Sequence, residues 1–348
     1  MKQREVDFLI VGQGIVGTML AFFLLKKNQQ VLVIDKKIPG SASQHSSGII
    51  NPITGRRFAK TWQIDTLLPF ARETYKELEV LLQSEFVEDI DIIKPITSTK
   101  EENDLSIDLG SEEHAPYFPM QEKLFLDKEK YNNSLGAYKI KQALKLNIAH
   151  LLNSFKQYLI NIDSYQEELF EYEKLDIENS MYNDMHFKKI IFCQGFANIH
   201  NPFFNDIDII PNKGEYLIIQ TKEKHQLKET ITSNGIISPL SEDTFYIGAT
   251  YEWVGDDVSI TKKGRKHLCN VFENICKMPY EIIKQGVGLR PAIQARRPII
   301  GMHAQYKNIG IMNAMGAKGT SLAPYYASQF SQFLLEGKEL DKEVSLKK

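Results

Sequence analysis

Residues 6–36 read VDFLIVGQGIVGTMLAFFLLKKNQQVLVIDK, and this stretch decides the fold. The segment 6–11 is apolar and rich in β-branched residues, which predicts a buried parallel strand. Apolar residues at helical spacing fill 18–27, and a second apolar strand then ends at Asp35. The first strand and the helix are joined by a G-x-G-x-x-G motif made of Gly12, Gly14 and Gly17.

Each glycine of the motif has a physical role. Gly12 permits a tight turn, Gly14 lets a pyrophosphate approach the backbone, and Gly17 lets the helix pack close to the sheet. The free N–H groups at the helix N-terminus attract phosphate. A carboxylate at Asp35 suits a ribose 2′-OH, which favours FAD or NAD over NADP. The alternative is that the three glycines serve only a tight turn. The order of strand, turn, helix, second strand and final acidic residue disfavours it.

Composition sets the outer limits. The chain has 348 residues, enough for one large domain or two, with 43% apolar and 25% charged residues and a net charge of −2. No global basic field points to nucleic acid, although a local basic patch stays open. We find no apolar run long enough to span a membrane and no signal peptide before the first strand. Because the three cysteines have neither metal nor disulfide-framework spacing, we expect a cytoplasmic protein without a metal site.

The rest of the chain alternates between sheet and helix patterns. We expect a loop near the cofactor over 36–57, and a solvated acidic loop around 101–113. A short strand over 137–140 and a helix over 141–160 follow, and 213–253 alternates like antiparallel strands. This order predicts a dinucleotide-binding domain built from residues 1–85, 137–210 and 290–348, and a substrate domain built from 86–136 and 211–289.

The C-terminal segment resembles a known signature. Gly288-Leu289-Arg290-Pro291, then Pro298-Ile299-Ile300-Gly301 and the Gly-rich turn from Gly316 to Pro324, are similar to the C-terminal motifs of the D-amino-acid oxidase (DAO) family of FAD-dependent oxidoreductases. That family includes glycine oxidase and sarcosine oxidase. The segments 213–220 and 245–253 resemble its substrate-domain strands. The resemblance covers nearly the whole chain and is weakest over 86–135 and 160–188.

The resemblance implies an α/β fold in which an antiparallel-sheet substrate domain is inserted into an FAD-binding Rossmann-like domain of the glutathione-reductase type. It implies oxidation of a small amine or amino acid by hydride transfer to flavin N5, with FAD as the cofactor. Whether oxygen or another acceptor takes the electrons stays open, as does the oligomeric state. The expected FAD-binding residues are Gly12, Gly14, Gly17, Asp35, Lys36, Ser43, His45, Gly48, Gly195, Arg290, Gly316, Lys318, Gly319 and Thr320.

Two cations are the expected catalytic residues. In relatives, the arginine equivalent to Arg290 holds the substrate carboxylate, and its planar fork suits bidentate pairing. The alternative is an arginine that forms a salt bridge within the sheet. Lys318 lies in the turn that runs beside the flavin in relatives, where a cation stabilises negative charge on the reduced ring or contacts substrate. A solvent-facing lysine is the alternative. The backbone N–H groups of Gly319 and Thr320 offer the same stabilisation.

Further side chains are candidates for substrate or flavin contact. The expected substrate contacts are Tyr246, Tyr251 and Arg56. For the tyrosines the alternative is a place in the core, and for Arg56 it is a surface ion pair. His45 matches a position where sarcosine and dimethylglycine dehydrogenases carry a flavin-linked histidine. We expect His45 to pack against the flavin without a covalent link.

Other functions stay open. A flavin domain of this family oxidises a carboxymethylamino group on a modified tRNA base, and there Arg290 would keep its role. Flavin monooxygenases carry a Gly-Asp in the late turn, which here reads Asn313-Ala314-Met315-Gly316 without an aspartate. A redox-inactive nucleotide-binding protein is the alternative from another class. Many members of the family have a histidine where Ala317 stands, so the substrate contacts differ from theirs.

Overall fold

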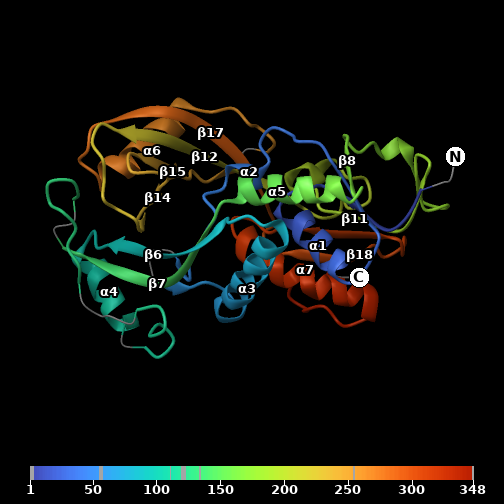
Figure 1. Cartoon of the computed structure of the whole chain (residues 1–348). Helices are drawn as coiled ribbons and strands as arrows, with labels where there is room; N and C mark the ends of the chain where they lie inside the picture. The colour runs from blue at the N-terminus through green and yellow to red at the C-terminus, as the bar shows by residue number, and fades with distance from the viewer. Residues whose placement is uncertain are drawn as a thin grey trace.

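The structure is a computed structural model that describes residues 4–54, 58–109, 111–118, 123–132, 135–253 and 255–346. Two large sheets organise this part of the chain (Figure 1). No helix within the described residues is long and apolar enough to cross a membrane.

The first sheet carries the dinucleotide motif. The strand order is β18 (Ile299–Met302), β19 (Ile309–Asn313), β11 (Met185–Phe192), β1 (Arg4–Val11), β2 (Val31–Asp35) and β8 (Tyr165–Glu167). The short strands β10 (Met181–Tyr182) and β9 (Leu175–Asp176) extend it from β11. Strands β19, β11, β1, β2 and β8 pair in parallel, and helix α1 (Ile15–Lys26) forms the crossover between β1 and β2. The pairs formed by β18, β10 and β9 are antiparallel.

Helices α1, α5 (Ile148–Asn161) and α7 (Gly319–Glu336) lie beside this sheet, and α3 (Ile64–Leu82) packs against α7 and β6 (Val87–Pro95) (Figure 1). Helix α1 is apolar on nearly every side, and it packs against α7 as well as against the sheet. A helix without a polar face is buried from both directions, and this burial fixes the position of its N-terminus.

The second sheet is mostly antiparallel. Its order is β16 (Glu252–Trp253), β12 (Ile210–Thr221), β15 (Thr244–Gly248), β14 (Ile236–Pro239), β13 (Thr230–Thr232), β6 (Val87–Pro95), β7 (Ala137–Leu146) and β3 (Ile49–Ile50). Strand β17 (Tyr280–Ala292) pairs with β12 along its length. Helix α6 (Lys262–Glu273) packs against β12 and β15.

The remaining elements are short, apart from one eleven-residue helix. Helix α2 (Ala42–His45) lies between the two sheets and contacts both β17 and α5 (Figure 1). The others are α4 (Thr99–Leu109), β4 (Ile53–Thr54), β5 (Ala59–Lys60) and the 3₁₀ turns η1 (Tyr172–Lys174) and η2 (Gly195–His200).

The architecture confirms the α/β fold with a parallel and an antiparallel sheet. Two local predictions are wrong. The segment 137–146 is one strand because it pairs with β6 from Ala137 to Leu146, and helix α5 begins only after Asn147, whose side chain accepts a hydrogen bond from the His150 N–H at 3.1 Å. The acidic segment forms helix α4, where Glu101 pairs with Lys94 at 2.6 Å.

The domain boundaries stay predictions. Two segments of the expected dinucleotide-binding domain pair within the antiparallel sheet: 137–146, which pairs with β6, and the edge strand β3, which lies within 1–85.

Candidate active site

A cavity opens where the carboxyl ends of the parallel strands face the second sheet. Ligands of open α/β folds bind at this edge. The residues that follow β1, β2, β11 and β19 line one side, and residues of β12, β15 and β17 line the other. Helix α2 and the N-terminus of α7 complete the wall.

The glycine motif leaves backbone exposed to this cavity. Gly12 has φ of +103°, and a Cβ there would lie 2.6 Å from the carbonyl oxygen of Cys193. A Cβ on Gly14 would lie 3.2 Å from Oγ of Ser43, which accepts a hydrogen bond from the Ile15 N–H at 3.1 Å. Gly17 does not line the cavity; a Cβ there would overlap the carbonyl of Gly12. Glycine is therefore needed at 12 and 17 for packing.

Asp35 ends β2 and lines the cavity. Its Oδ1 accepts a hydrogen bond from the Gln13 N–H at 2.9 Å. Burial raises the pKa of the carboxyl above its usual value, and this effect outweighs the lowering by that hydrogen bond. A carboxylate that keeps free lone pairs beside the glycine motif suits a ribose diol.

His45 joins the dinucleotide motif region to the second sheet. Its Nδ1 lies 3.1 Å from the hydroxyl of Tyr216, and its carbonyl accepts a hydrogen bond from the hydroxyl of Tyr246 at 3.2 Å. The two tyrosine rings stack with centroids 5.1 Å apart. Burial, with smaller contributions from Lys284 and Lys37, lowers the pKa of His45, so the ring is neutral at pH 7.

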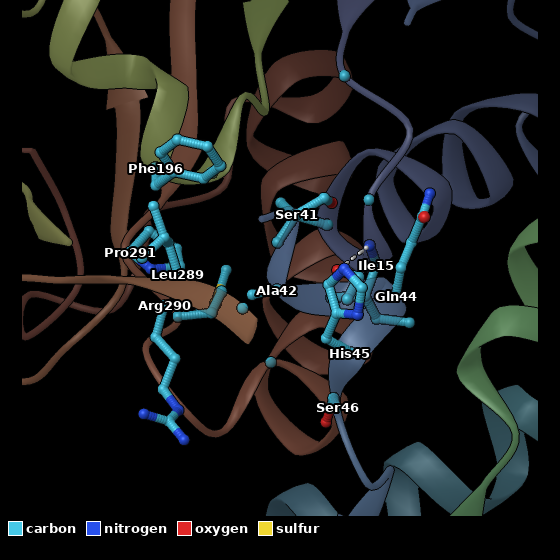
Figure 2. A pocket seen from close by; sticks show the side chains of 18 of the residues that line it. Ile15, Ser41, Ala42, Gln44, His45, Ser46, Phe196, Leu289, Arg290 and Pro291 are labelled. Atoms are coloured by element: carbon cyan, nitrogen blue, oxygen red, sulfur yellow. Dashed lines mark hydrogen bonds between the residues drawn. The ribbon is translucent and has the colours of Figure 1, made fainter. Parts of the chain in front are cut away.

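Arg290 lines the cavity from β17 (Figure 2). Its Nη1 donates to Oδ1 of Asn212 at 2.7 Å and to the carbonyl of Thr250 at 3.2 Å. The guanidinium also lies 5.7 Å from the ring centroid of Tyr251. All of these partners are neutral, and no carboxylate within the described residues forms an ion pair with it. Burial lowers the pKa of the guanidinium.

The structure brings most of the expected site residues together. Those that line the cavity are Gly12, Gly14, Asp35, Lys36, Ser43, His45, Gly195, Tyr246, Arg290, Gly316, Gly319 and Thr320. Gly48 does not line it, because this glycine packs against the backbone of Leu146. Lys318 lines a second, adjoining cavity. Arg56 lies outside the described residues.

Several lining residues were not anticipated from the sequence. Glu168, Leu169 and Phe170 follow β8 in the segment of weakest resemblance, where no motif marked them. Gly214, on β12, and Ala249, after β15, bring backbone to the cavity wall. In the sequence, Gly214 could have been noticed as a glycine inside a strand pattern, and Ala249 as a small residue directly after a strand pattern.

These residues fit a dinucleotide. Glycines 12 and 14 leave room at the backbone, the first turn of α1 offers free N–H groups, and Asp35 offers acceptors at the end of the next strand. No cluster of three or more potential metal-ligating residues occurs within the described ranges.

Comparison with known proteins agrees with this geometry. The family model of FAD-dependent oxidoreductases, DAO, matches residues 7–332. A segment of 56 residues is 39% identical to the uncharacterized oxidoreductase YurR of Bacillus subtilis (strain 168), but the match covers only 15% of that protein and 16% of this chain.

Solved structures are similar over almost the full length. Glycine oxidase from Bacillus cereus ATCC 14579 superposes with a TM-score of 0.78 at 17% identity, over 96% of each chain. Iminodiacetate oxidase from Chelativorans sp. BNC1 gives 0.77 at 20% identity, again over 96% of each chain. An L-α-glycerophosphate oxidase from Mycoplasma pneumoniae with FAD bound gives 0.69 at 16% identity, over 99% of each chain. At these identities the likeness establishes the fold.

Proposed function

Because the chain belongs to the DAO family of FAD-dependent oxidoreductases, we propose that it oxidises the C–N bond of a small amine or amino acid that carries a carboxylate. The family match confirms the family, the enzyme class and the FAD cofactor that the sequence predicts. The substrate class belongs to the proposal. It is supported by the names of the similar glycine and iminodiacetate oxidases, and above all by Arg290.

Arg290 is the observation that carries the proposal. A guanidinium that lines a cavity and contacts only neutral acceptors keeps its positive charge uncompensated. Removing such a charge from bulk water costs free energy unless an anion pairs with it. A substrate carboxylate supplies that anion and pairs with the remaining N–H groups of the fork. Asn212 and Thr250 hold one side of the guanidinium, so its orientation is fixed before substrate arrives.

The other residues hold the cofactor and shape the site. Gly12, Gly14 and Asp35 would bind the pyrophosphate and ribose of FAD, and the N-terminus of α7 would face the end of the cavity near Arg290. Bound FAD supplies the acceptor for a hydride from the carbon that bears the nitrogen. The hydroxyl of Tyr246 donates to His45, and burial raises its pKa, so this tyrosine shapes the wall and does not act as a base. An amine that enters neutral needs no proton-abstracting residue.

Matched pairs of amines test the proposal. The purified flavoprotein is mixed anaerobically with sarcosine or dimethylamine, with glycine or methylamine, and with a panel of D-amino acids, and flavin bleaching is followed. We expect bleaching by at least one carboxylate-bearing amine and much slower bleaching by its partner without the carboxylate. Equal rates within each pair would remove the proposed role of Arg290.

A further inference from the structure

A second cavity adjoins the first. The two share the lining residues Ile49, Ile236, Ala317 and Thr320. The second cavity has a volume of about 310 Å³, at the lower end of the range for small-molecule sites. A substrate held at Arg290 that extends past the shared residues therefore enters this space.

The polar lining of the second cavity offers donors. Thr232, the last residue of β13, and Ser233, which follows it, line this cavity, and their hydroxyls form no hydrogen bond within the described residues. The N-terminal turn of α7 contributes Thr320 and Ser321. The N–H and the hydroxyl of Ser321 both donate to the carbonyl of Lys318 at 3.1 Å. The N–H groups of Gly319 and Thr320 are therefore the ones that this helix N-terminus offers to an anion.

The charges of this lining are all positive. Lys94 and Lys318 line the second cavity, and no aspartate or glutamate of the described residues does. Lys94 is compensated by Glu101, which lies 2.6 Å away. Lys318 is an exposed residue that has no acidic partner within the described ranges, and partial desolvation, followed by the charge of Arg297, lowers the pKa of its ammonium. Arg290 in the first cavity and Lys318 in the second thus have no carboxylate partner within the described residues; the same holds for Lys36 and Lys37, which are exposed and line the first cavity.

We propose that Lys318, with the hydroxyls of Thr232 and Ser233, binds a second anionic group of the substrate. The preferred substrate is then an amine with one carboxylate at Arg290 and a further carboxylate or phosphate in the second cavity. This inference rests on the proposed function for the identity of the substrate as an amine. It assigns Lys318 to substrate binding, where the sequence left both the flavin and the substrate open.

Binding of anions that cannot be oxidised tests the inference without turnover. The flavin absorbance of the purified holoprotein is titrated with acetate, malonate, succinate, glutarate and phosphonoacetate, and a Kd is obtained for each. We expect at least one dianion to bind ten times more tightly than acetate, since charge-assisted hydrogen bonds are added. Tighter binding of phosphonoacetate than of malonate indicates a phosphate-bearing substrate, and the reverse order indicates a dicarboxylic one.

Variants locate the effect. Lys318→Met should reduce the dianion preference to below threefold, Lys318→Arg should retain it, and the exposed Lys266→Met on α6 controls for a lost charge. Equal affinity for acetate and all dianions in the wild type, or a preference that survives in Lys318→Met, overturns the inference.

The two proposals fail separately. If dianions bind through Lys318 but no amine bleaches the flavin, the second anion site stands and the proposed function falls. If monocarboxylate amines bleach the flavin but no dianion preference exists, the proposed function stands and the second anion site falls.

Discussion

The guanidinium of Arg290 occupies the space that a side chain at Gly214 would fill. Strands β12 and β17 pair in a register that places Gly214 opposite Gly288 and Asn212 opposite Arg290, and the arginine side chain crosses back over position 214. A Cβ at 214 would overlap Cζ, Nη1 and Nη2 of the guanidinium. The glycine is therefore a condition for the orientation of Arg290.

Gly214→Ala should displace Arg290 while FAD stays bound. The guanidinium would lose its hydrogen bonds to Asn212 and Thr250. We therefore expect kcat/KM for a carboxylate-bearing amine to fall about 10-fold or more, because losing one charge-assisted hydrogen bond costs roughly 1.5 kcal/mol. The flavin content per protein checks that the cofactor site is intact. Wild-type kcat/KM in the variant would show that Arg290 is not positioned in this way.

Gly14→Val should prevent FAD binding. A Cβ at this position already lies 3.2 Å from Oγ of Ser43, and the two further methyl groups would fill the space left for the pyrophosphate. Gly14→Ala, which adds only the Cβ, is the matched variant and should keep part of the binding. The ratio of flavin to protein absorbance, with circular dichroism as a check on folding, measures both. A Gly14→Val protein that purifies fully yellow would refute the pyrophosphate site.

Asp35→Asn should separate stability from cofactor binding. Burial raises the pKa of Asp35 in the folded protein, so the folded state binds the carboxyl proton more tightly than the unfolded state does. The protonated carboxyl therefore contributes to folding stability at low pH. That contribution is lost as the pH rises from about 3.9, the unfolded value, through the raised pKa of the folded state. Asparagine stays neutral and can still accept from Gln13. Without FAD the variant should therefore unfold at higher urea concentration than the wild type at pH 7, with a smaller difference toward pH 4.

The same substitution should weaken FAD binding about tenfold, because the amide is a poorer acceptor for the ribose hydroxyls, roughly 1.4 kcal/mol. Fluorescence titration of the FAD-free protein measures the affinity. A variant that is both less stable without FAD and unchanged in FAD affinity would contradict the role of Asp35.

The flavin should be released by acid. His45 holds Tyr216 through Nδ1 and Tyr246 through its carbonyl, so its ring is engaged by the second sheet. After acid precipitation we expect the yellow colour in the supernatant. A yellow pellet for the wild type, with a colourless pellet for His45→Ala, would instead establish a covalent link.

The dinucleotide half of the fold was predictable because its signals are local. The apolar strand, the three glycines and Asp35 lie within a short stretch, and each has a fixed place in the turn, helix and strand. Within 137–146 apolar and polar residues are mixed in a way that suits either a helix or a strand. Pairing with β6, which is distant in sequence, selects the strand over the whole segment.

The site was less predictable where it depends on tertiary contacts. Arg290 was identified from its motif, but that its partners are neutral and that Gly214 makes room for it follows from the register of two strands. Lys318 was expected at the flavin or the substrate, and its place in the second cavity follows from the tertiary arrangement that brings it near residues of β13 and β3. Glu168 to Phe170 form an irregular stretch after β8, and their sequence has no motif.

The most direct test of the central proposal compares wild type with Arg290→Met in anaerobic flavin reduction by the best carboxylate-bearing amine and by its partner without the carboxylate. We expect the carboxylate amine to lose about 10- to 150-fold in kcat/KM in the variant, from roughly 1.5–3 kcal/mol of lost charge-assisted pairing, while the partner amine changes little. Arg265→Met, on α6, should behave as wild type. Equal loss for both amines, or no loss for either, would contradict carboxylate binding by Arg290.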